Sequence, residues 1–140
     1  MTNYREIIGY AVLIVVLLIA SQHLNVVVSG SMEPVFYRGD IVIVEKTNFL
    51  GIQEFDPHDV QVGDIVVYDA VWYNSPVVHR IVNITEINGT TYYEIKGDNN
   101  NASDPYYATA DQIQERVLSF NGQPLIIPKI GYITIMLRGF

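Results

Sequence analysis

The sequence predicts a mainly β domain that is preceded by one N-terminal transmembrane helix. No formal charge occurs between Glu6 and Glu33. An apolar helix that starts at Ile7 could therefore continue through Leu24 and reach about the length that a bilayer requires. Beyond that stretch, segments rich in Val, Ile, Tyr and Thr alternate with Gly, Asp, Asn and Pro, which is typical of β domains. The 140 residues are enough for one hydrophobic core.

The overall composition excludes several functional classes. Hydrophobic residues make up 49% of the chain and charged residues only 16%, which favours a membrane protein or an unusually apolar core. The net charge of −7 disfavours nucleic-acid binding, because that function needs a clustered basic surface. The chain has no cysteine, so a thiol nucleophile, a disulfide framework and a thiolate metal site are all excluded.

We interpret the apolar segment as an uncleaved anchor. A cleaved signal peptide has small residues one and three positions before the cut, and Leu18 with Ala20 supplies only half of that pattern. Arg5 precedes the segment and the next basic residue is Arg38, so the positive-inside rule leaves the short N-terminus in the cytoplasm. The predicted parts are a cytoplasmic N-terminus, a transmembrane anchor and an extracytoplasmic β domain, at residues 1–6, 7–26 and 27–140.

Five strands are expected in the β domain, at residues 40–46, 64–70, 77–84, 91–96 and 116–120. The Asn88-Gly89 pair is the strongest short hairpin signal and should join the third strand to the fourth. Residues 48–61 have no clear period and are expected to form a surface excursion. Residues 126–140 leave three alternatives open, namely a last strand, an interfacial segment or the stump of a second helix. Sequons that fit an exported domain begin at Asn83, Asn88 and Asn101.

Of the three histidines, His79 is the one that lies in an apolar strand. Arg80 follows it, so the two side chains should point to opposite faces of the sheet. The simplest explanation of His79 alone is a partly buried ring that binds a backbone carbonyl. Asp98 and Asp104 lie in an Asn-rich loop whose spacing matches neither a calcium loop nor a zinc motif. We therefore expect no metal and no cofactor, although a metal-dependent hydrolase that uses His79 with both aspartates stays an alternative.

Residues 28–34, with the sequence Val-Ser-Gly-Ser-Met-Glu-Pro, join the anchor to the domain. Serine and glycine are common in flexible linkers, so this stretch alone could be a simple connection. Combined with His79 and one of the two aspartates, however, Ser31 would have a base and a group that orients that base. Gly30 permits unusual dihedral angles, which could aim the Ser31 N–H at a developing oxyanion, and the Ser29 hydroxyl could be a second donor.

Taken together and in this order, the motifs resemble the type I signal peptidases. After the N-terminal anchor they are SGSMEP at 29–34, RGDIVIVEK at 38–46, VGDIVVY at 62–68, VHRIV at 78–82 and GDNN at 97–100. The resemblance covers nearly the whole chain up to Pro128. Bacterial members carry lysine where this chain has His79, so the resemblance is to the archaeal and endoplasmic-reticulum branch.

The resemblance implies a compact, β-barrel-like catalytic domain and a role for each candidate residue. It makes Ser31 the acylated nucleophile, His79 the general base and Asp104 the group that orients His79. Asp98 would be a second functional carboxylate, which either orients its loop or assists His79. Ser29 would lie next to the oxyanion hole.

The resemblance also implies substrates and partners. The substrates would be preproteins with small side chains one and three residues before the cut, bound in extended form beside a sheet edge. Substrate specificity would come from two shallow pockets, and we expect their lining to include Val28 and residues of the strand at 41–44. The enzyme would work in the cell membrane, or in the endoplasmic-reticulum membrane with a lumenal domain, with the lipid bilayer and the secretion translocon as neighbours. The alternative from another class is a membrane-anchored β domain that binds a ligand or partner and catalyses nothing.

Overall fold

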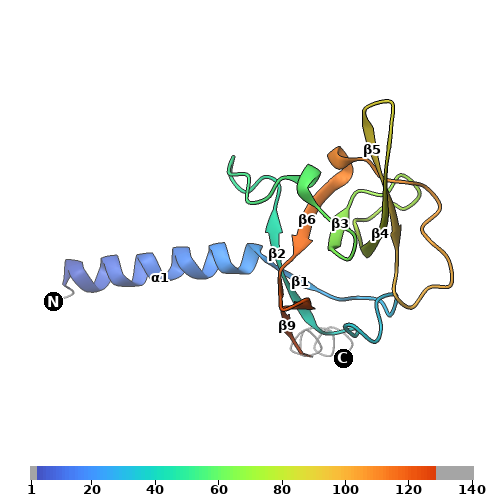
Figure 1. Cartoon of the computed structure of the whole chain (residues 1–140). Helices are drawn as coiled ribbons and strands as arrows, with labels where there is room; N and C mark the ends of the chain where they lie inside the picture. Colours follow the sequence, from blue (N-terminus) through green and yellow to red (C-terminus); the bar gives the residue numbers. More distant parts are fainter. Residues whose placement is uncertain (1–2, 129–140) are drawn as a thin grey trace.

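A long apolar helix, α1 (Tyr4–Gln22), extends away from a β domain in the computed structural model, which describes residues 3–128 (Figure 1). Asn3 precedes the helix, and its side chain accepts a hydrogen bond from the backbone N–H of Arg5 at 3.2 Å. Every residue of α1 is exposed. The helix is long and apolar enough to cross a membrane.

The helix ends earlier than the sequence predicts. The predicted anchor ran to residue 26, but strand β1 (Leu24–Val26) already occupies its last three positions and pairs antiparallel with β2 (Ile41–Lys46). His23 caps the helix, and its backbone N–H donates to the Ala20 carbonyl at 3.1 Å. Apolar residues suit a helix and a strand equally well, so the pairing with β2 decides where α1 stops.

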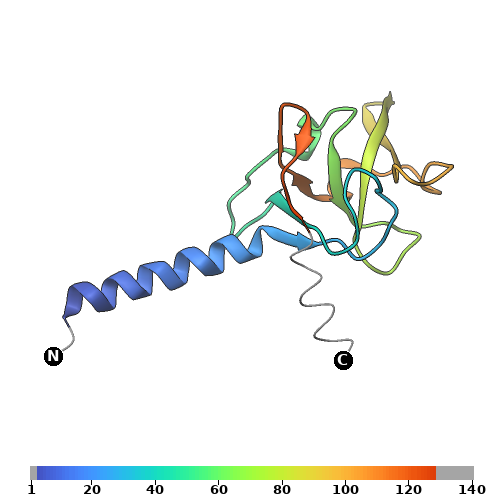
Figure 2. The same ribbon diagram turned by 90° about the horizontal axis from the view of Figure 1, so that it is seen from below.

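The β domain is built on a curled, half-barrel sheet, which confirms the predicted mainly β fold (Figures 1 and 2). The strand order is β1-β2-β6-β3-β4-β5, and β9 also pairs with β2. The strands not yet defined are β3 (Ile65–Tyr68), β4 (Val77–Ile87), β5 (Thr90–Lys96), β6 (Ile113–Val117) and β9 (Ile126–Ile127). Outside this sheet lie a small hairpin and two short 3-10 helices, namely β7 (Ser119–Phe120) with β8 (Gln123–Pro124), Pro57–Asp59 and Ala110–Gln112.

All five predicted strands are present, with shifted ends. The prediction at 116–120 is divided, because β6 starts three residues earlier, at Ile113, and β7 forms a separate hairpin. Asn88 and Gly89 have φ angles of 52° and 80° and make the predicted turn between β4 and β5. Of the C-terminal segment, residues 126 and 127 form β9, whereas residues 129–140 lie outside the described residues.

Two hydrophobic clusters form the core. The larger one includes Tyr68, Ile81, Tyr93 and Ile95, and the smaller one includes Met32, Phe36, Val42 and Val44. The predicted surface excursion at 48–61 contributes Phe55 and Val60 to the larger cluster, so it is only partly on the surface. The smaller cluster fixes the chain on both sides of the Ser-Gly-Ser-Met stretch, which is the first element of the candidate site.

Candidate active site

The Ser-Gly-Ser-Met stretch is pinned to the domain and is no flexible linker. Met32 and Phe36 are each only 1% exposed and pack in the smaller core cluster. The carbonyl of Ser31 accepts a hydrogen bond from the backbone N–H of Asn99 at 2.8 Å. The Asn99 side chain donates to the Gly30 carbonyl at 3.0 Å. Ser31 is therefore held between the core and the loop that follows β5.

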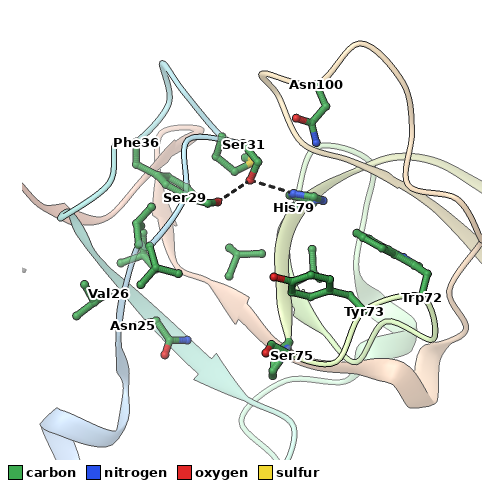
Figure 3. Close-up of a pocket in the computed structure, with 17 residues that line it drawn as sticks. Asn25, Val26, Ser29, Ser31, Phe36, Trp72, Tyr73, Ser75, His79 and Asn100 are labelled. Carbon is green, nitrogen blue, oxygen red and sulfur yellow. Dashed lines mark hydrogen bonds between the residues drawn. The ribbon is translucent and has the colours of Figure 1, made fainter. Parts of the chain in front are cut away.

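A continuous chain of hydrogen bonds connects Ser31, His79 and Asp104. His79 lies on β4 and is 5% exposed, and its Nε2 lies 3.0 Å from Ser31 Oγ (Figure 3). Its Nδ1 lies 2.9 and 2.8 Å from the two carboxylate oxygens of Asp104. A neutral ring that donates from Nδ1 to a carboxylate leaves Nε2 free to accept the serine proton. The fold thus brings together three residues that are far apart in the sequence.

Asp98 lies outside this chain of hydrogen bonds. Arg80, the residue after His79 on β4, donates to Asp98 from Nε and from Nη2, each at 2.9 Å. Its Nη1 donates to the Gly63 carbonyl at 2.8 Å. These contacts tie the loop after β5 to the sheet, which favours the loop-orienting alternative for Asp98. The three residues of the metal-site alternative do not converge, and no group of three or more potential metal ligands occurs among residues 3–128.

Two aromatic residues that no sequence motif singles out, Tyr68 and Trp72, extend the network behind Asp104. The Tyr68 hydroxyl donates to Asp104 Oδ2 at 2.5 Å and accepts a hydrogen bond from Trp72 Nε1 at 3.2 Å. Burial, and then the Asp104 carboxylate, raise the pKa of Tyr68 well above its usual 10.0, so the phenol keeps its proton and donates. The sequence held one weak signal, since Tyr68 ends an apolar strand and a buried tyrosine hydroxyl needs a partner.

Gly97 lets the loop after β5 approach the site closely. A Cβ at this position would lie 2.8 Å from the Ser31 carbonyl oxygen and 3.0 Å from His79 Nε2. It would also lie 2.7 Å from the Asn100 side chain. Because the Ser31 oxygen belongs to the backbone, no side-chain rotation relieves that contact. In the sequence this glycine stands out only as the first residue of the GDNN motif.

An apolar cavity of about 360 Å³ opens beside Ser31 and His79 (Figure 3). Val28 and Val42 both line it. The Ser29 hydroxyl also faces this space and lies 3.1 Å from Ser31 Oγ. Strand β1 stands at the end of the strand order, so among the described strands only β2 pairs with it. An extended chain could therefore lie along the outer edge of β1 and reach the cavity.

Comparison with known proteins identifies the family. Residues 1–111 match the family described as signal peptidase, peptidase S26. An uncharacterized protein of Methanocaldococcus jannaschii is 35% identical, with 90% of this chain and 89% of that protein covered. The signal peptidase complex catalytic subunit SEC11 is 42% identical in Pyricularia oryzae and 38% in Verticillium alfalfae. These two matches cover 80% of this chain and 62% of each relative, so the chain spans less than two thirds of the SEC11 length. The chain belongs to the signal peptidase family, peptidase S26, and to its archaeal and endoplasmic-reticulum branch.

Proposed function

We propose that this protein is a membrane-anchored serine endopeptidase that removes signal peptides from exported preproteins, with Ser31 as the nucleophile and His79 as its general base. The observation that carries the proposal is the chain of hydrogen bonds from Ser31 Oγ through His79 to Asp104, at 3.0 and 2.8 Å. A serine hydroxyl is a weak nucleophile, and a base within hydrogen-bond reach activates it. Membership of the signal peptidase family supports the class of substrate.

The reaction has two halves. In the first, His79 Nε2 accepts the Ser31 proton while Oγ attacks the carbonyl carbon at the cleavage site, and the imidazolium then protonates the leaving amine of the mature chain. In the second, His79 takes a proton from water, the resulting hydroxide attacks the acyl carbon, and the proton returns to Ser31 as the signal peptide leaves. Asp104 fixes the tautomer of His79 and stabilises the imidazolium in both halves.

The oxyanion would be stabilised by donors that lie next to the nucleophile. The Ser29 hydroxyl is close enough, since its oxygen lies 3.1 Å from Ser31 Oγ, and the backbone N–H of Ser31 would be the second donor. Gly30 between them gives the backbone the freedom that this arrangement needs. Asp98 would act on this site indirectly, through the loop that binds the Ser31 carbonyl.

The substrate would bind in extended form along the edge of β1, with its small side chains in the cavity lined by Val28 and Val42. Helix α1 would anchor the enzyme, with the N-terminus in the cytoplasm and the β domain on the other side of the membrane. Ser31 follows closely on the end of α1, so the nucleophile would work near the membrane surface, where the signal peptide leaves the bilayer and the secretion translocon is at hand.

Cleavage of a preprotein by the full chain in liposomes tests this proposal. Ser31→Ala should abolish cleavage, whereas Ser29→Ala should lower kcat by about a hundredfold, as expected for one lost oxyanion donor. Activity should fall at acid pH, because an imidazolium cannot accept the hydroxyl proton. Persistent activity of Ser31→Ala would show that the nucleophile is misassigned, and loss of activity with a chelator would favour metal-dependent hydrolysis. A wild-type chain that binds preproteins without cleaving them would favour the non-catalytic alternative.

A further inference from the structure

The turn that follows β2 exposes two large apolar side chains. Leu50 is 84% exposed and Ile52 is 61% exposed. Residues 47–53 carry no charged side chain, so the tip of this turn is apolar and uncharged. A single exposed leucine is ordinary on a protein surface, and the position and conformation of this turn are what make it unusual.

The turn is fixed beside the end of α1. The His23 and Phe49 rings contact each other edge to face, with their centroids 4.7 Å apart. The two His23 nitrogens bind the Ile19 carbonyl at 2.8 Å and the Glu54 carboxylate at 2.9 Å, which joins the last turn of the helix to the base of the loop. In both views the blue-green segment after β2 lies beside the end of α1, level with its last turn (Figures 1 and 2).

The backbone at the tip has a conformation that leucine rarely adopts. Leu50 and Gly51 have φ angles of 52° and 84°, and paired backbone hydrogen bonds of 2.8 and 2.9 Å between Phe49 and Ile52 close the turn. Two-residue turns of this kind favour asparagine, aspartate or glycine in the first position. A leucine there gives up local stability and exposes its side chain to solvent, which points to a binding role for the side chain.

We propose that this turn inserts Leu50 and Ile52 into the lipid bilayer beside the end of α1, and so gives the catalytic domain a second membrane contact. The inference rests on the membrane-anchoring part of the proposed function. Lipid is the occupant that the position favours, because a helix that crosses the membrane brings the bilayer surface to its own last turn. The charges at the base of the loop suit the headgroup layer, since Glu54 pairs with His23 there. Together, helix α1 and this turn would fix the tilt of the active site above the membrane.

Site-specific fluorescence tests the proposal, and the absence of cysteine from the chain makes single labelling straightforward. The full chain with Leu50→Cys, labelled with bimane and reconstituted in phosphatidylcholine vesicles, should be quenched severalfold more by doxyl-labelled lipid than the Ile87→Cys control. Ile87 is 54% exposed beside the β4–β5 turn, which lies away from α1 in both views. If the label at position 50 were quenched no more than the label at position 87, the proposal would be overturned. The same result is expected if the turn binds a protein partner in cells and not lipid.

Two further variants separate the possible failures. A Leu17→Cys label in α1 should be strongly quenched. A water-exposed label there would overturn both the anchor and this proposal, whereas the catalytic assignment would still be tested by cleavage of a soluble peptide in detergent. Leu50→Asn keeps a residue that suits the turn and should release a label at Ile52→Cys from the lipid. It should also keep full activity on a soluble peptide in detergent. Unchanged quenching at position 52 would show that Leu50 does not hold the turn in the bilayer.

Discussion

Replacing Tyr68 with phenylalanine tests whether the network behind Asp104 contributes to catalysis. The substitution removes one hydroxyl, which donates to Asp104 at 2.5 Å and accepts from Trp72 at 3.2 Å. The Asp104 side chain is 3% exposed, so water has little access to replace the lost donor. The carboxylate that orients His79 would then be held by fewer hydrogen bonds and could turn away from Nδ1.

The size of the effect follows from the kind of hydrogen bond. One hydrogen bond to an ionised group contributes about 1.5–3 kcal/mol. If all of it were lost in the transition state, kcat would fall by about 10- to 150-fold. KM should change little, because Tyr68 is absent from the lining of the cavity in the described structure. A fall in kcat at constant KM is the signature of an interaction that acts on the transition state and not on substrate binding.

The assay is the initial rate of cleavage of a fluorogenic peptide by the full chain in detergent, which gives kcat and KM separately. Tyr93→Phe is the matched control, because Tyr93 is equally buried in the same core cluster and its hydroxyl donates to the Pro57 carbonyl at 3.2 Å. That control should lose about 1 kcal/mol of stability and keep a kcat within about twofold of wild type. If Tyr68→Phe showed the same pattern, Tyr68 would be a core residue with no part in positioning Asp104.

Gly97→Ala should lower activity at least a hundredfold while the chain stays folded, because the added methyl group would push Ser31 and the His79 ring apart. Peptide-cleavage rates measure the activity and circular dichroism checks the fold. Near-normal activity would contradict the close approach of Gly97 to Ser31. Asp98→Ala should lower the unfolding free energy by about 1–2 kcal/mol, because it removes the ion pair with Arg80. It should lower the cleavage rate less than Asp104→Ala does. An equal fall in the cleavage rate would give Asp98 a direct role. Because the pKa of Tyr68 is higher in the folded chain than in the unfolded chain, the protonated phenol stabilises the fold fully below pH 10. This contribution is lost as the pH rises further. The difference in melting temperature between wild type and Tyr68→Phe should therefore narrow at pH 11, and a constant difference would contradict this. Leu50→Asn should stabilise the chain by about 1 kcal/mol in a denaturant titration, because it relieves a left-handed leucine; a loss of stability would show that the leucine is packed.

The strands that the sequence predicts well are those with continuous β-branched runs, such as 64–70 and 77–84. Strand β6 was predicted to start too late because Gln114-Glu115-Arg116 is a polar run. In the structure the charged residues of β6 form ion pairs with β2: Arg116 with Glu45, and Glu115 with Lys46. A strand stabilised by ion pairs to its neighbour has no hydrophobic period of its own, so the pattern appears only once the neighbour is known.

The candidate site also combines residues that a local pattern reveals with residues whose role depends on a neighbouring segment. Ser31 and His79 could be proposed from the chemistry of their side chains, whereas the choice of Asp104 over Asp98 came from the family resemblance. Asn99 and Gly97 act through the backbone of Ser31, by a hydrogen bond at 2.8 Å and by leaving room for the approach. Their contribution depends on which segment lies opposite, and no local pattern encodes that.

The junction between α1 and the domain fixes the place of the proposed nucleophile, Ser31, relative to the proposed membrane anchor. A flexible linker would let the domain tumble and would move Ser31 relative to the bilayer. Instead, β1 begins directly after the His23 cap and pairs with β2, and Met32 is buried in the smaller core cluster. The position of Ser31 relative to the helix end is therefore set by backbone pairing and packing. Under the proposed function, a signal peptide that leaves the bilayer in extended form would meet the edge of β1 at a fixed distance from the helix end, and this would select the cleavage position.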